Sequence, residues 1–121
     1  MTTTAHPDLT EFLARQVELI HAGDADGLAA RYAEDAEMVR FDTVAQGRAE
    51  IRDLLAAYMA RSPQVLGQPS AVVTGDVILY RSLLLLDGRD TLSVGTLVFR
   101  DGLVWRQTAA FLDIGPRELP A

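Results

Sequence analysis

The stretch HAGDADGLAARYAEDA, from His21 to Ala36, carries the signals that set the order of the first structural elements. Gly23 stands where a helix would end, because glycine readily takes the left-handed conformation of a helix C-cap. Asp24 can then cap a short second helix through its side-chain oxygen. This second helix is expected to carry Leu28, Tyr32 and Ala33. The stretch therefore predicts a helical hairpin that leads into a strand at Ala36.

Upstream of this stretch, the sequence predicts a longer helix. Asp8 is a suitable N-cap, and Glu11, three residues on, completes a pair of the capping-box type. Apolar residues then recur with the helical period, so one continuous stripe must face the core. The stripe consists of Leu9, Phe12, Leu13, Val17 and Ile20, with Gln16 as its one polar member.

Downstream, the pattern predicts a strand over 36–41, a third helix and then four strands. The third helix follows Gln46-Gly47 and ends at Ser62-Pro63, and its charged residues, Arg48 among them, read as a solvated face. The strands are expected over 65–73, 77–86, 91–100 and 103–112, with a four-residue loop at 87–90 and a two-residue hairpin turn at 101–102. The order predicts an α+β fold in which a bent antiparallel sheet wraps three helices and leaves a pocket.

Composition narrows the functions that such a fold could carry. The chain has 121 residues, 17 acidic against 11 basic, and a net charge of −6, which disfavours nucleic acid and anionic membranes as partners. Cysteine is absent and only two histidines occur, so neither a thiol nucleophile nor a metal site is expected. The longest apolar run, 77–86, is about half the length of a membrane span. The N-terminus carries no secretory signal, so a cytoplasmic location is expected.

Three segments of the chain form a recognisable set: the run 21–36, GRAEI at 47–51 and LVFRDGLVW at 97–105. They resemble the opening signature, the start of the third helix and the closing hairpin of the nuclear transport factor 2-like superfamily. This superfamily includes ketosteroid isomerases, limonene epoxide hydrolase and polyketide cyclases of the SnoaL type. The resemblance covers about 9–113. It implies a single SnoaL-like domain over 1–121, with a cone-shaped curved sheet around three N-terminal helices, the cystatin-like roll. It also implies homodimers through the sheet.

The catalytic positions of the best known members are replaced in this chain. The resemblance places the tyrosine of the ketosteroid isomerases at Gln16, their general base at Arg40 and their second aspartate near Gly95. It places the arginine of limonene epoxide hydrolase at Arg81 but that enzyme's two aspartates near Leu83 and Gln107. We therefore expect neither of these two activities.

Strand parity and the helix stripe predict which side chains line the pocket. The polar candidates are Gln16, Arg40, Asp42, Arg81 and Gln107, and the walls are expected from Met38, Tyr58, Met59, Trp105 and Phe111. A buried guanidinium needs a partner, and Asp42 is the nearest in sequence to Arg40. Arg40 and Asp42 could instead pair at the pocket rim, and Arg81 could instead lie at an interface. Tyr58 and Trp105 could be ordinary core.

These residues lead to one principal functional hypothesis and two alternatives. The principal hypothesis is a cofactor-independent isomerase, cyclase or dehydratase that acts on a hydrophobic oxygenated ligand. In it Asp42 is the base, Arg40 and Arg81 hold a developing oxyanion, and Gln16 and Gln107 orient the substrate. The first alternative is a non-catalytic ligand binder with the same pocket. The second is a protein-association module that uses the apolar outer face of strand 77–86.

Overall fold

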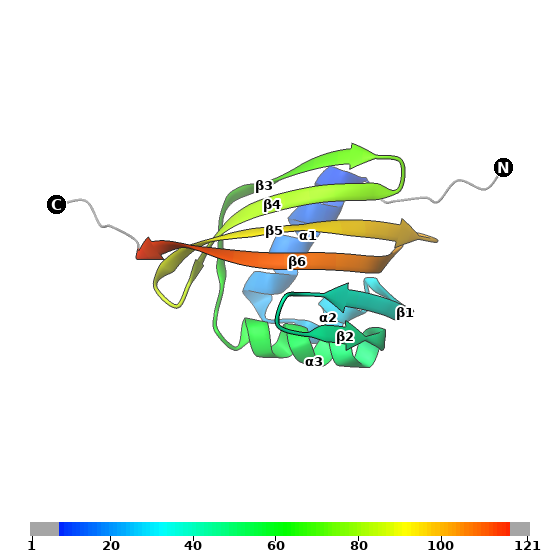
Figure 1. The fold of residues 1–121 in the computed structure, drawn as a ribbon, viewed down its shortest axis with the longest axis horizontal. Coiled ribbons are helices and arrows are strands. Elements are labelled where there is room, and N and C mark those ends of the chain that lie inside the picture. The colour runs from blue at the N-terminus through cyan, green and yellow to red at the C-terminus, as the bar shows by residue number, and fades with distance from the viewer. Residues whose placement is uncertain (1–7, 117–121) are drawn as a thin grey trace.

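A computed structural model describes residues 8–116, which form three helices and six strands. The strands make one curved sheet in the order β2-β1-β6-β5-β4-β3, and α1 crosses one face of it (Figure 1). Neighbouring strands are antiparallel except β1 and β6, which run parallel. The predicted α+β architecture of a curved sheet around three helices is confirmed. The elements are α1 (Leu9–Ala22), α2 (Ala25–Ala29), β1 (Tyr32–Val39), β2 (Val44–Gln46), α3 (Gly47–Met59), β3 (Gln64–Thr74), β4 (Val77–Leu86), β5 (Arg89–Arg100) and β6 (Leu103–Pro116).

The ends of α1 follow from the capping residues in the sequence. The Asp8 side chain accepts a hydrogen bond from the backbone N–H of Glu11 at 3.0 Å, and Gly23 takes the left-handed conformation with φ of 68°. Asp24 caps α2 in the same way, through the N–H of Gly27 at 2.8 Å. These local bonds satisfy backbone donors that a helix start leaves free.

The second helix is shorter than predicted, because the last residues predicted for it form a strand that pairs with a distant part of the chain. α2 ends at Ala29, and Tyr32 and Ala33 belong to β1 instead. The backbone N–H of Val104 donates to the carbonyl of Arg31 at 2.9 Å, which fixes the chain beside β6 at this point. The strand predicted over 36–41 therefore spans Tyr32–Val39, and the sequence did not predict β2, which follows a turn and pairs antiparallel with β1.

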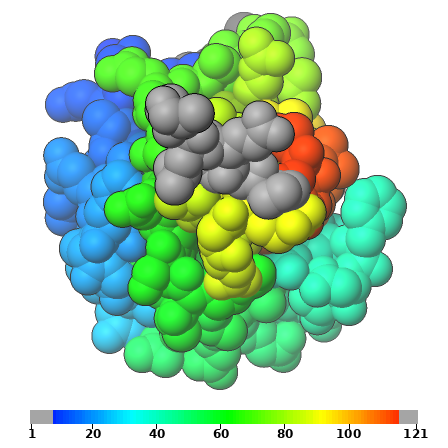
Figure 2. Space-filling model, turned by 90° about the vertical axis from the view of Figure 1, so that its left-hand side faces the viewer, coloured from blue at the N-terminus to red at the C-terminus, as the bar shows by residue number. Residues whose placement is uncertain are grey.

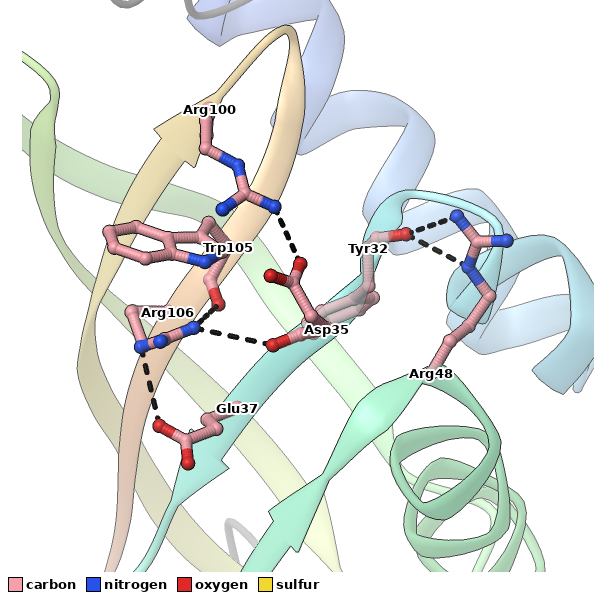
Figure 3. Close-up of polar contacts among 7 residues, drawn as sticks. All are labelled: Tyr32, Asp35, Glu37, Arg48, Arg100, Trp105 and Arg106. Carbon is pink, nitrogen blue, oxygen red and sulfur yellow. Dashed lines mark hydrogen bonds and ion pairs between the residues drawn. The ribbon is translucent and has the colours of Figure 1, made fainter.

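The core lies between the three helices and the concave face of the sheet. Its largest fully buried side chains include Tyr32, Phe99, Leu28 and Ile51. Phe12 of α1 meets Phe99 edge to face, with ring centroids 5.1 Å apart. Arg48 does not belong to a solvated face as predicted: its Nε and Nη2 donate to the carbonyl of Tyr32 at 2.9 and 2.8 Å (Figure 3). This guanidinium ties α3 to the start of β1.

Both hairpins between the last three strands have two-residue turns. Asp87 and Gly88 have φ of 53° and 75°, and Asp101 and Gly102 have φ of 54° and 79°. Two successive positive φ values are the mark of the type I′ turn, whose twist matches that of the strands. The turn predicted at 101–102 is confirmed, whereas the four-residue loop predicted at 87–90 is wrong because Arg89 and Asp90 already pair in β5.

The convex face of the sheet carries no helix, and several exposed apolar side chains lie on it on either side of Arg81. Leu79, Leu83 and Leu112 lie on it, with Val72 on the neighbouring β3. The loop between β1 and β2 stands out from the surface at another place, at the lower right of Figure 2 (turquoise), and it carries Phe41, which is 99% exposed. Within residues 8–116, no helix has both the length and the apolar character that crossing a membrane requires.

Candidate functional site

A cavity of about 120 Å³ lies between α1, α3 and the concave face of the sheet. An engineered protein cavity of about 150 Å³ binds benzene, so this space matches roughly one aromatic ring. Every element except β2 contributes to its wall. The helices supply Phe12, Leu13, Gln16, Val17, Ile20, Leu28, Leu54, Leu55 and Tyr58. The strands supply Tyr32, Met38, Val65, Pro69, Tyr80, Ser82, Leu84, Ser93, Leu97, Gln107, Ala109 and Phe111, and Arg40 follows the end of β1.

Six of the ten side chains predicted to line the pocket lie in this wall, and four do not. The six are Gln16, Met38, Arg40, Tyr58, Gln107 and Phe111. The four outside it are Asp42, Met59, Arg81 and Trp105. Each of the four lies outside the wall for a structural reason of its own.

Arg81 lies on the opposite face of the sheet from the cavity. On β4 the even-numbered residues Tyr80, Ser82 and Leu84 face inward, and Arg81, between them, is exposed. The apolar run of this strand has the same character on both faces, so its pattern could not show which parity is inner. Met59 is buried, but it faces a separate and more open hollow beside Ile20.

A β-bulge turns Trp105 away from the cavity. Val98 pairs with Arg106 and Phe99 with Val104, so Trp105 is the extra residue on β6. A bulge reverses the alternation of faces along a strand. Gln107 therefore faces inward although Trp105, two residues before it, does not.

Trp105 is instead held between two guanidinium groups, as Figure 3 shows. Arg100 and Arg106 lie 4.9 and 4.0 Å from the ring centroid. Each arginine also has an acidic partner on β1: Arg100 donates to Asp35 at 2.5 Å, and Arg106 pairs with Glu37 at 3.3 Å. This cluster joins the β5–β6 hairpin to β1. Trp105 therefore contributes to the packing of the sheet and not to the cavity wall.

Arg40 and Asp42 form a pair at the edge of the cavity. Arg40 Nε and Nη2 donate to the two carboxylate oxygens of Asp42, both at 3.0 Å. The Arg40 side chain is 20% exposed and lines the cavity, whereas the Asp42 side chain is 66% exposed and lies outside its wall. Arg40 also lies 5.3 Å from the ring centroid of Phe111. The arrangement is that of a rim pair, with its carboxylate directed away from the enclosed space.

A chain of hydrogen bonds forms the polar part of the cavity wall. Tyr32 Oη donates to Gln107 Oε1 at 2.5 Å, and Gln107 Nε2 donates to Tyr80 Oη at 3.0 Å. Tyr80 Oη in turn donates to the backbone carbonyl of Thr108 at 3.4 Å. Sequence reasoning missed both tyrosines, although the even parity of 77–86 contains Tyr80 and the opening stretch contains Tyr32.

Burial keeps the three cavity tyrosines protonated. It raises the pKa of Tyr58 to about 12, and it also raises the pKa values of Tyr32 and Tyr80 above the ordinary value of 10.0. Desolvation is the main cause in each case, since it disfavours the phenolate. At neutral pH these hydroxyls can donate hydrogen bonds, but they do not act as bases.

An alkaline titration followed by near-ultraviolet absorbance should show directly that the three tyrosines hold their phenolic protons above the usual pH. The three are all the tyrosines of the chain. Above about pH 10 the unfolded chain releases phenolic protons that the folded chain still holds, so the free energy of unfolding falls as the pH rises. We expect no phenolate signal at about pH 10 and a steep, cooperative rise together with unfolding at higher pH. A gradual titration centred near pH 10 with native circular dichroism would contradict the burial of these groups.

Gln16 is held on the helix side of the cavity. Its Oε1 accepts a hydrogen bond from Arg31 Nη1 at 2.7 Å, and the Arg31 guanidinium lies 3.7 Å from the ring centroid of Phe12. Burial lowers the pKa of Arg31. The bond to Arg31 therefore fixes the Gln16 side chain in the cavity wall.

His21 lies outside the cavity, in the last turn of α1. Its Nε2 accepts a hydrogen bond from the backbone N–H of Val65 at 3.0 Å, which joins the end of α1 to the start of β3. In the described part of the chain, no cluster of three or more metal-ligating side chains is found. Nor does any Asp, Glu, His or Cys side chain of residues 8–116 line the cavity.

Comparisons with known proteins identify the fold. No protein-family model matches the sequence, and no match is found among curated proteins. Among solved structures, a nuclear transport factor 2-like protein with a cystatin-like fold from Novosphingobium aromaticivorans is 28% identical, with a TM-score of 0.61 over 88% of this chain and 81% of that one. A protein from Kribbella flavida proposed to be a ketosteroid isomerase is 23% identical, with a TM-score of 0.72 over 93% and 82%. A protein from Sinorhizobium meliloti proposed to be a polyketide cyclase is also 23% identical, with a TM-score of 0.71 over 85% and 96%. The predicted superfamily resemblance is confirmed at the level of the fold.

Proposed function

We propose that this chain, which has the nuclear transport factor 2-like fold, binds a hydrophobic molecule of about one aromatic ring in the cavity between α1, α3 and the sheet. One observation carries the proposal: the cavity wall is mostly apolar, but it includes a fixed hydrogen-bonded chain through Tyr32, Gln107 and Tyr80. Ligand sites are usually of this kind, with a few polar groups that set the orientation of an apolar ligand. A filled core would have no such space.

The side chains of the cavity wall favour ligand binding over proton transfer as the function of the cavity. Removing a proton from carbon requires a base within hydrogen-bond reach of the substrate. The predicted base, Asp42, is directed outward and paired with Arg40. The tyrosines have raised pKa values and stay protonated. We therefore favour a non-catalytic binder over an isomerase, cyclase or dehydratase.

Toluene is a suitable first probe, because its size matches the cavity. We expect toluene to raise the melting temperature of the protein in proportion to the logarithm of its concentration, since it binds only the folded state. Ala109→Leu should abolish this effect, because Ala109 lines the cavity and a larger side chain would fill it. The matched control is Ala110→Leu, on the outer face of the same strand, which should leave toluene binding unchanged.

Two results would overturn the proposal. One is a wild-type protein whose melting temperature does not respond to toluene or to other single-ring compounds. The other is an Ala109→Leu protein that binds toluene as tightly as the wild type does.

Association through the convex face of the sheet is a second candidate function. Val72 is 68% exposed and Leu79 54%, and with Leu83 and Leu112 they extend over β3, β4 and β6. Exposed apolar side chains that gather on one face of a sheet favour a protein contact there. The partner that we propose is a second copy of this chain, as the resemblance to homodimeric families implies.

Light scattering at micromolar concentration should give the mass of a dimer. Leu79→Glu should shift the protein to monomer, because it places a carboxylate beside Val72, where the dimer would bury apolar surface. Phe41→Glu is the matched control: Phe41 is more exposed, at 99%, but lies on the β1–β2 loop. A monomeric wild type would remove this candidate.

A further inference from the structure

Among residues 8–116, Arg40 is the one charged side chain in the cavity wall. It lies two residues beyond Met38, which pairs with Gln107 and also lines the cavity. Its guanidinium carbon lies 5.3 Å from the ring centroid of Phe111, another wall residue. Because the Arg40 side chain is 20% exposed, a molecule at the edge of the cavity can reach it.

The partner of this guanidinium comes from outside the wall. Asp42 accepts from Arg40 Nε and Nη2, both at 3.0 Å, but its own side chain is 66% exposed on the loop between β1 and β2. Water solvates such a carboxylate well, so an ion pair with it adds little to stability. A second carboxylate can therefore compete with Asp42 for the charge of Arg40.

The surroundings of Arg40 suit an anionic group on a ligand. An arginine fork binds a carboxylate through two charge-assisted hydrogen bonds, which are stronger than bonds between neutral groups. In the part of the chain that the structure describes, Arg40 Nη1 makes no hydrogen bond, so donors remain on the guanidinium. No Asp or Glu side chain of that part lines the cavity, where it would repel an anion.

We propose that the ligand of the cavity is a single-ring aromatic carboxylate, whose ring fills the apolar space and whose carboxylate binds Arg40 at the edge. Asp42 is the competitor of that carboxylate for the same guanidinium. This inference rests on the proposed binding function. It adds the charged group that the ligand carries and the residue that binds it.

Benzoate and toluene are the two probes, because they share the ring and differ in carboxylate against methyl. Their dissociation constants are measured by calorimetry at pH 7, where benzoate is ionised. We expect the wild type to bind benzoate more tightly than toluene. Arg40→Gln should weaken benzoate binding at least about tenfold, the usual loss of a hydrogen bond to a charged group, and leave toluene binding unchanged. Unchanged toluene binding also shows that the cavity of the variant is intact.

Asp42→Asn should have the opposite effect on benzoate. The asparagine keeps an oxygen that accepts from Arg40, but it removes the negative charge that competes with the ligand. We expect benzoate to bind about threefold more tightly and toluene to bind as in the wild type. A purely structural role of the pair would not produce this gain.

Two control variants repeat these charge changes away from the cavity. Arg81→Gln removes an exposed arginine on the outer face of β4, and Asp101→Asn removes an exposed aspartate in the turn between β5 and β6. Both should leave the two dissociation constants at their wild-type values. A change in benzoate binding equal to that of Arg40→Gln or Asp42→Asn would show an effect of net charge alone.

The outcomes separate this inference from the function on which it rests. If toluene binds the wild type but benzoate binds no more tightly, or if Arg40→Gln leaves benzoate binding unchanged, the inference is wrong while the binding function stands. Benzoate binding that Asp42→Asn leaves unchanged or weakens would overturn the competition between the two carboxylates. If neither probe binds the wild type, the binding function itself is wrong, and the inference falls with it.

Discussion

Phe99→Ala should lower the free energy of unfolding by about 4 kcal/mol, the largest effect that we expect from a single truncation. Phe99 is completely buried, and its ring meets Phe12 of α1 edge to face at 5.1 Å. Truncation removes apolar contact and leaves a cavity at the junction of α1 and β5. Denaturation with urea, followed by circular dichroism, measures the loss.

Phe41→Ala is the control for this experiment, because the chemical change is identical and only burial differs. Phe41 is 99% exposed, so its truncation should change stability by less than about 0.5 kcal/mol. A loss below about 2 kcal/mol for Phe99→Ala would show that this part of the core is packed loosely or differently.

Gly95→Ala should cause the second large loss in the free energy of unfolding, because the added Cβ has no space. A Cβ at this position would lie 2.0 Å from the carbonyl oxygen of Thr108 and 2.5 Å from Tyr80 Oη. Gly95 pairs with Tyr80 across β4 and β5, so the absence of a side chain there lets the Tyr80 hydroxyl reach Gln107 and Thr108. We expect a loss of about 3 kcal/mol, measured by the same denaturation.

Two further variants identify the clash that matters. In a Tyr80→Phe background, Gly95→Ala should remain strongly destabilising, because the clash with the Thr108 backbone persists. Gly88→Ala should cost only about 1 kcal/mol, since its φ of 75° is unfavourable for alanine but no atom lies within 4 Å of the added Cβ. Full recovery in the Tyr80→Phe background would assign the effect to the hydroxyl alone.

The cavity and the fold depend on the same few contacts. Gly95 makes room for Tyr80, and Arg48 holds the backbone of Tyr32, so the two tyrosines that bind Gln107 are fixed by the sheet and by α3. A polar wall supported in this way needs no rearrangement to receive the ligand that we propose. Preorganisation of this kind reduces the entropy that binding would otherwise cost.

The sequence by itself determined the features that depend on residues close together in the chain. Asp8, Gly23 and Asp24 cap their helices through bonds that span no more than four residues. The stripe on α1 and its polar member Gln16 follow from the helical period, and the turn at 101–102 follows from its residue types. Together with the strand pattern of 65–112, these signals predicted the α+β order of the elements.

Only the tertiary structure decided which way the strand residues face. Arg81 and Ser82 are neighbours in a run that is apolar on both parities, so the pairing with β3 and β5 determines which of them enters the cavity. Trp105 is turned outward by a bulge whose position depends on the register between β5 and β6. Tyr32 leaves its helical pattern because β6, some seventy residues later in the chain, pairs with it at Val104. Strand register is a contact between distant segments, and a shift of one residue exchanges the two faces of a sheet, so local pattern cannot fix it.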